Sequence, residues 1–250
     1  MTANTERVAG KIAIVTGGAS GIGEAIATVL ANEGARVLIC DIDSAKGEAL
    51  AARLGDAVRF CKLNVASASD WQAAVETAEA SFGPVTVLVN NAGILDVAPL
   101  DEMSEEAFRR VVDVNQVGPF LGMKSVVGSM RKAGGGSIVN ISSAAGIVPL
   151  PMMTSYVASK FAVTGMSQVA SIDLAKYNIR VNSVHPGSIA TPLTAGATSS
   201  PTRQAIKRHG QPEEVAAMVL FLSSDEASFC TGAKYIVDGG FLNVVGEVHV

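Results

Sequence analysis

A tyrosine and a lysine stand four residues apart in the segment TSYVASKFAV, at Tyr156 and Lys160. An α-helix turns once in about 3.6 residues, so both side chains leave the same face if this segment is helical. A free tyrosine has a pKa near ~10 and is a poor base at neutral pH unless a nearby cation stabilises its phenolate. The lysine ammonium is such a cation, so the spacing predicts a pair that moves a proton to or from a substrate.

A glycine-rich segment, TGGASGIG at 16–23, follows the first apolar run and opens the first amphipathic stretch. Glycines let a backbone turn sharply and approach a pyrophosphate, whose charge a helix N-terminus stabilises. Several glycines could also form an ordinary strand-to-helix turn. The context favours a dinucleotide site, and the residues that we expect to form it are Gly17, Ser20, Gly21, Ile22 and Gly23.

Asp41 follows this segment by about 18 residues and ends the second apolar run, close to the ~20 expected for a carboxylate that binds an adenosine ribose. A 2′-phosphate would be repelled there, and the segment IDSA after Asp41 offers no basic partner. These features favour NAD over NADP. Lys46 lies near enough in sequence to keep NADP as an alternative, and a merely solvated aspartate is another.

The elements that must position these residues follow an alternating pattern of apolar runs and amphipathic stretches. The uninterrupted apolar runs are typical of strands covered on both faces, and we expect ligands beyond their carboxyl ends. The pattern predicts an α/β protein, a single-domain Rossmann fold over 1–250 with a doubly wound, seven-stranded parallel sheet and helices on both faces. Strands are expected at 11–16, 35–41, 57–63, 85–90, 136–142, 178–184 and 233–239, and helices at 21–33, 71–82, 104–130, 156–176 and 212–222.

Composition narrows the partners. Hydrophobic residues make up 48% of the chain, and 19 basic against 23 acidic residues give a net charge of -4, which argues against binding to nucleic acid or anionic membranes. The start of the chain lacks the apolar core of a signal peptide, so we expect a cytoplasmic protein. Three scattered cysteines and three histidines, with Glu247 near His249, match no metal motif, so we expect no catalytic metal.

Six motifs in order resemble those of the short-chain dehydrogenase/reductase family, and the resemblance spans nearly the whole chain. Segments such as GGGSIVNISSAAG and RVNSVHPG are most similar to bacterial NAD-dependent hydroxysteroid dehydrogenases and other secondary-alcohol dehydrogenases. The motifs are TGGASGIG at 16–23, NNAG at 90–93, Asn115, Ser143, YVASK at 156–160, and Pro186 with Gly187.

The resemblance implies four catalytic residues. Ser143 would hold the substrate oxygen, and family spacing selects it over its neighbour Ser142. Tyr156 would be the general base in alcohol oxidation and the general acid in ketone reduction. Lys160 would favour the phenolate and reach the nicotinamide ribose, and Asn115 would hold a water that links the lysine to solvent.

The resemblance also extends the cofactor site beyond the glycine segment and Asp41. Asn64 stands where the family typically has aspartate, so its contact to adenine should be weaker. His185, beside Pro186 in an expected turn, is tempting as a base, but the tyrosine already fills that role. The further cofactor residues are Asn64, Val65, Asn91, Ala92, Gly93, Tyr156, Lys160, Pro186, Gly187, Ile189 and Thr191.

The substrate is constrained least. The apolar segment GIVPLPMMTS favours a hydrophobic secondary alcohol or ketone of alicyclic, aromatic or steroidal type. Ser143, Met153 and Tyr156 are expected to contact it, with packing beneath the cofactor or against a neighbouring subunit as alternatives for Met153. The stretch 188–210 is expected to form a substrate lid. The resemblance implies a homotetramer. Two other functions stay open: a 3-oxoacyl-[acyl-carrier-protein] reductase, and a non-catalytic NAD-binding sensor or scaffold.

Overall fold

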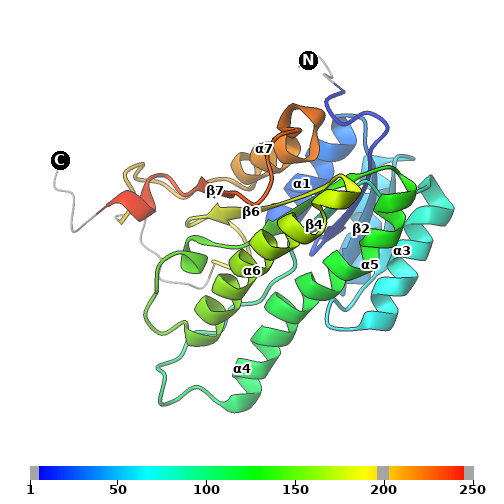
Figure 1. Ribbon diagram of the computed structural model, residues 1–250. Coiled ribbons are helices and arrows are strands. Elements are labelled where there is room, and N and C mark those ends of the chain that lie inside the picture. Colours follow the sequence, from blue (N-terminus) through cyan, green and yellow to red (C-terminus); the bar gives the residue numbers. More distant parts are fainter. Residues whose placement is uncertain (1–5, 196–202, 245–250) are drawn as a thin grey trace.

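Seven parallel strands form the centre of the molecule (Figure 1), which is described by a computed structural model over residues 6–195 and 203–244. Their order is β3-β2-β1-β4-β5-β6-β7, so the chain winds outward twice from β1 and β4. This confirms the predicted Rossmann-type α/β fold. The strands are β1 (Ile12–Thr16), β2 (Arg36–Asp41), β3 (Val58–Lys62), β4 (Val87–Asn90), β5 (Gly136–Ile141), β6 (Ile179–Pro186) and β7 (Lys234–Val237).

Helices cover both faces of the sheet (Figure 1). The helices α1, α2 and α7 lie on one face, and α3, α5 and α6 lie on the other, with α4 packed against α6. None of the described helices is both long and apolar enough to cross a membrane. The helices are α1 (Gly21–Asn32), α2 (Ser44–Leu54), α3 (Ala68–Phe82), α4 (Glu105–Val112), α5 (Gly118–Lys132), α6 (Thr154–Asp173) and α7 (Pro212–Ser223).

Each face of the sheet has its own hydrophobic core. Successive side chains of a strand point to opposite faces, so in β1 Val15 packs towards α1 and α7 while Ile14 packs towards α3 and α5. The second core includes Trp71, whose indole nitrogen donates a hydrogen bond of 2.9 Å to the carbonyl of Val65. Burial on both faces explains why the strands are nearly continuous apolar runs.

The helix α2 was not predicted. Only Gly47 and Leu50 of its residues are buried, so the segment lacks the apolar stripe by which a helix is recognised in a sequence. Asp43 is the N-cap residue of α2, and its carboxylate accepts a hydrogen bond of 3.1 Å from the amide of Lys46.

The single helix predicted over 104–130 was wrong, because a π turn (Asp113–Val117) separates α4 from α5. Pro119 lies in the first turn of α5 and has no amide hydrogen to bond the carbonyl four residues earlier, that of Asn115. The ladder changes register here, and the amide of Gly118 bonds the carbonyl of Asp113 instead. Asn115 lies in the middle of this turn.

Candidate active site

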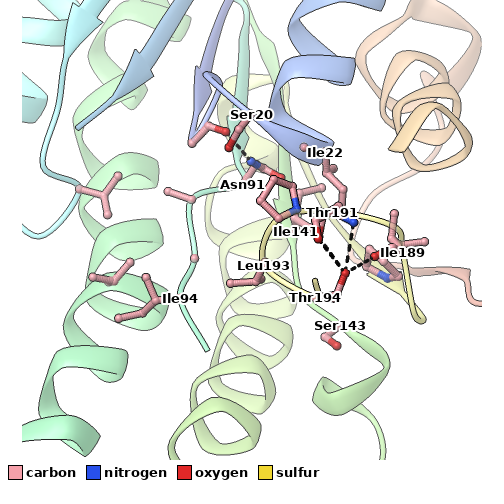
Figure 2. A pocket seen from close by; sticks show the side chains of 18 of the residues that line it. Ser20, Ile22, Asn91, Ile94, Ile141, Ser143, Ile189, Thr191, Leu193 and Thr194 are labelled. Carbon is pink, nitrogen blue, oxygen red and sulfur yellow. Dashed lines mark hydrogen bonds between the residues drawn. The ribbon is translucent and has the colours of Figure 1, made fainter. Parts of the chain in front are cut away.

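A cavity of about 350 Å³ runs along the carboxyl ends of the strands (Figure 2). Ser143 lines it together with every residue predicted to bind the cofactor except Gly23. In Figure 2, Ser20 and Asn91 lie above Ser143. The cofactor residues that line the cavity are Gly17, Ser20, Gly21, Ile22, Asp41, Asn64, Val65, Asn91, Ala92, Gly93, Tyr156, Lys160, Pro186, Gly187, Ile189 and Thr191.

The glycine segment forms a cradle between β1 and α1 that matches a pyrophosphate. Gly17 and Gly21 adopt positive φ angles of 60° and 56°, which side chains rarely allow. A Cβ on Gly23 would lie 2.0 Å from the carbonyl oxygen of Gly17, so Gly23 serves the packing of α1 on the loop instead of lining the cavity. Among the described residues, the side chain of Ser20 makes no hydrogen bond to the backbone amides in the first turn of α1. The hydroxyl and those amides suit an anion.

Asp41 is held rigidly at the carboxyl end of β2. Its carboxylate accepts hydrogen bonds of 3.1 Å from the amides of Ala19 and Asp43. Lys46 forms an exposed ion pair of 3.1 Å with Asp43. Within the described lining, Lys160 is the only basic side chain. The arrangement suits a ribose diol better than a phosphate at this end of the cavity.

Two asparagines of the predicted cofactor site bond to the protein's own backbone. The amide nitrogen of Asn91 donates to the carbonyls of Thr16 and Gly17, at 3.0 and 3.1 Å, and so braces the glycine loop. The side-chain oxygen of Asn64 accepts from the amide of Ala66 at 3.1 Å. Both residues therefore shape the cavity wall through the main chain.

Ser143, Tyr156 and Lys160 meet at the wall formed by β5 and α6. Ser143 follows β5, and its hydroxyl oxygen accepts a hydrogen bond of 3.1 Å from the amide of Ala145. Lys160 is buried and donates from Nζ to the carbonyl of Ile141 at 2.9 Å. This nitrogen lies 5.5 Å from the centre of the Tyr156 ring. The helix therefore presents both side chains to one place, one turn apart.

Burial shifts the pKa values of Tyr156 and Lys160 in opposite directions. Burial raises the pKa of Tyr156, and the hydrogen bond with Ser143 only partly opposes this. Burial also lowers the pKa of Lys160 to about 8. The structure by itself holds Tyr156 as a neutral phenol at pH 7.

Asn115 is buried in the π turn and does not line the cavity. Its side chain accepts from the amide of Ile94 and donates to the carbonyl of Ile94, both at 2.8 Å, and it donates to Ser159 at 3.3 Å. It therefore ties the segment after β4 to α6, beside Tyr156 and Lys160. These three bonds occupy the side-chain amide of Asn115. The prediction that Asn115 holds a water did not include them.

The loop after β6 is tied down by a residue that was not predicted. The hydroxyl of Thr194 donates to the carbonyl of Ile189 at 2.6 Å and accepts from the amide of Thr191 at 3.1 Å (Figure 2). Thr194 lines the cavity. The sequence does contain a signal for this role, because Thr194 stands three residues after Thr191 and threonine hydroxyls often bond the nearby backbone.

The predicted lid over 188–210 is anchored at both ends. The buried side chain of Gln204 accepts from the amide of Ser188 at 3.2 Å and donates to the carbonyl of Arg208 at 2.6 Å. A short bridge also pairs Ile189 with Gly210. The middle of the lid, 196–202, lies outside the described residues.

Met153 does not line the cavity, although it was predicted to contact the substrate. It precedes α6 and forms a bridge with Ala98, which bonds it to the segment after β4. Apolar lining at the catalytic end comes from other elements, including Ile94 and Leu193. These two side chains were missed because both stand in loops, where no periodicity marks a buried face.

The remaining titratable groups form no recognisable centre within the described residues. No three histidine, cysteine or acidic side chains there approach closely enough to hold a metal, and Glu247 and His249 lie outside this part of the chain. Cys40, Cys61 and Cys230 are free thiols. His185 lies in β6, which corrects the predicted turn, because β6 continues to Pro186 along the edge of β7.

Comparison with known proteins agrees with the motifs. The family described as enoyl-(acyl carrier protein) reductase matches residues 17–242. A 3-alpha-(or 20-beta)-hydroxysteroid dehydrogenase from Mycobacterium tuberculosis is 43% identical over 243 residues, covering 97% of this chain and 93% of that protein. A cyclohexanol dehydrogenase from an Acinetobacter strain is 43% identical over 240 residues, covering 92% and 94%. An NADP-dependent (R)-specific alcohol dehydrogenase from Lentilactobacillus kefiri is 41% identical over 248 residues, covering 95% and 98%.

Proposed function

The chain belongs to the short-chain dehydrogenase/reductase family, and we propose that it transfers a hydride between NAD and a hydrophobic secondary alcohol or ketone. One observation carries the proposal. The proton-handling residues Ser143, Tyr156 and Lys160 line the same cavity as the glycine cradle and Asp41. A proton donor and a dinucleotide cradle in one cavity are the two parts that such a reaction needs.

Tyr156 would take the hydroxyl proton in alcohol oxidation and return it in ketone reduction. The Ser143 hydroxyl oxygen accepts from the amide of Ala145, and its hydrogen, which bonds Tyr156 in the structure, would turn to the substrate oxygen when a substrate binds. Bound NAD supplies a hydride acceptor and a positive ring. Burial raises the pKa of Tyr156, so the phenolate needs a nearby cation that lowers this pKa again. Lys160, held by Ile141, would position the ribose and relay the proton.

NAD is the proposed coenzyme because of Asp41. A 2′-phosphate beside this fixed carboxylate would meet repulsion and no basic lining residue among those described. One similar protein is named as NADP-dependent, so the family alone does not decide this point. Replacing Asp41 with alanine should reduce the preference for NAD over NADP by about tenfold or more, measured as the ratio of kcat/KM values. An unchanged ratio would contradict the assignment.

The proposed substrates are alicyclic, aromatic or steroidal. Two similar proteins are named for a hydroxysteroid and for cyclohexanol, and the apolar lining by Ile94 and Leu193 supports a bulky apolar substrate. The acyl-carrier-protein reductase predicted as an alternative would need a thioester chain in the same place.

The proposed assembly is a homotetramer in the cytoplasm, where free thiols stay reduced. The outer side of α6 exposes Phe161, Val169 and Ile172, the last at 77% of its surface. Apolar side chains gathered on one helix favour packing against a second copy of the chain. Sedimentation of the purified protein tests this, and a monomer at micromolar concentration would remove the assembly without affecting the chemistry.

The test of the reaction uses purified protein with NAD or NADP and a panel of cyclohexanol, hydroxysteroids and a 3-hydroxyacyl thioester. Formation of reduced coenzyme is followed by absorbance. Tyr156→Phe should lower kcat by about a hundredfold or more while NAD still binds, and Tyr177→Phe, which alters a tyrosine outside the cavity, should not. Equal turnover in Tyr156→Phe would refute the proposal. Turnover of the thioester alone, or NAD binding without turnover, would support the two alternatives.

A further inference from the structure

His185 is a completely buried histidine to which the proposed reaction gives no role. It lies in β6, one residue beyond Val184, which is the last position of β6 paired with β5. Its Nδ1 lies 2.9 Å from the carbonyl oxygen of Ser143, and its Nε2 lies 2.8 Å from the hydroxyl of Ser183. A carbonyl can only accept, so Nδ1 carries the hydrogen and Nε2 accepts from Ser183.

The ring stays in this neutral form at ordinary pH. Burial lowers the pKa of His185, the hydrogen bond to Ser143 opposes the shift, and the charges of Lys234 and Lys160 add to the lowering. In this form Nε2 accepts from the Ser183 hydroxyl, whose oxygen also lies 3.4 Å from the carbonyl of Ala233. The bond from Nδ1 to Ser143 is therefore present in the state in which the enzyme would work.

Ser143 needs such a bond because it lies where the sheet ends. The last ladder bond between the two strands joins the amide of Ser142 to the carbonyl of Val184 at 2.8 Å. The chain then leaves the sheet and turns through Ala144–Gly146. The amide of Gly146 also donates to the Ser143 carbonyl, at 2.9 Å, but it belongs to that same turn. The ring of His185 thus links Ser143 to the sheet itself.

We propose that His185 is a positioning residue, which holds the Ser143 peptide so that the serine hydroxyl faces the substrate oxygen. The inference rests on the proposed function for the role of Ser143 and on the two ring contacts for the role of His185. Fixing a carbonyl fixes its peptide plane, and with it the direction in which the adjacent side chain leaves the backbone. A displacement of a reacting group by about 1 Å can cost about a hundredfold in rate.

Two amide substitutions separate the two ring contacts. The Nδ1 atom of histidine lies three bonds from Cα, as does the amide nitrogen of asparagine, whereas Nε2 lies four bonds away, as does the amide of glutamine. His185→Asn should keep the bond to Ser143 and lose the bond to Ser183, and His185→Gln should do the reverse. We expect kcat to fall about tenfold or more in His185→Gln and about threefold or less in His185→Asn, with the KM for NAD changed less than about twofold in both.

A control and a second measurement complete the experiment. Ser183→Ala removes the partner of Nε2 and should leave kcat within about twofold, so an equal loss in Ser183→Ala and His185→Gln would overturn the inference. Amide hydrogen exchange at Ala145 and Gly146 needs no substrate, and it should be about tenfold faster in His185→Gln than in His185→Asn. If the wild-type protein oxidises no alcohol, the proposed function fails, and the exchange rates alone decide. Faster exchange in His185→Gln than in His185→Asn would support the role of His185, and equal rates or the reverse order would overturn it.

Discussion

Replacing Lys160 with methionine should stabilise the protein while removing its activity. Lys160 is only 4% exposed, and burial lowers its pKa from 10.5 to about 8. The unfolded lysine therefore binds its proton more tightly than the folded one, and the difference corresponds to about 3 kcal/mol against folding below pH 8. A methionine fills a similar space without a charge to bury.

The gain is reduced by one lost contact. Methionine leaves the carbonyl of Ile141 without the donor that Nζ provides at 2.9 Å, at a cost of about 1–2 kcal/mol. The net expectation at pH 7 is a variant more stable by about 1–2 kcal/mol. The penalty on the wild type is complete below pH 8 and disappears as the pH rises past 10.5, above which the lysine is neutral in both the folded and the unfolded state. The advantage of the variant should therefore shrink across that window and end as a small deficit.

Urea unfolding without coenzyme, at about pH 7 and about pH 10, measures this difference directly. Lys124→Met is the matched control, because Lys124 is an exposed lysine on α5 that water solvates in both states. A variant less stable than wild type at neutral pH, or an advantage that is the same at both pH values, would refute the reasoning. Loss of turnover in the stabilised variant would show that the site keeps its lysine at the expense of stability.

Three further outcomes are expected. Alcohol oxidation should speed up and ketone reduction slow down as pH rises, because burial raises the pKa of Tyr156 and only oxidation needs the phenolate. Profiles of kcat/KM against pH, measured in both directions, should therefore have opposite slopes. Gly23→Ala should lower the melting temperature and weaken NAD binding about tenfold, because the new Cβ would lie 2.0 Å from the carbonyl oxygen of Gly17. Calorimetry measures the melting temperature and titration measures NAD binding; an unchanged melting temperature would contradict the tight packing of Gly23 on the loop. Cys61 should react first with iodoacetamide at neutral pH, because a hydrogen bond with Cys40 lowers its pKa to about 6, and equal labelling of Cys230 in a peptide map would count against this.

Much of the fold could be predicted because its strands carry a strong signal. Burial on both faces requires apolar residues at nearly every position of strands such as β1 and β4, and turn residues mark where each strand ends. The glycine positions could be predicted as well, since Gly17 and Gly23 meet backbone where no side chain fits. Parallel strands place all their carboxyl ends together, so motifs distant in sequence were expected in one cavity.

Other features depend on contacts that local patterns do not record. The helix α2 buries too little to show a stripe, and the π turn lies just before Pro119, which has no amide hydrogen to continue the α-helical ladder. The raised pKa of Tyr156 comes from burial by the whole site, which a spacing of four residues cannot express. Met153 was expected at the substrate because its segment is apolar, whereas in the structure its backbone forms a bridge with Ala98 and it does not line the cavity.

The π turn at Asp113–Val117 has a consequence for how homologous chains can differ in length. One residue of an α-helix corresponds to a rotation of about 100°, so deleting a residue there would swing the whole of α5 around its axis. Met123, Val126 and Met130 would then face away from the second core, and Asn115 would lose Ile94. Insertions and deletions should accumulate in the surface loops and spare this turn, whatever substrate the enzyme evolves to accept.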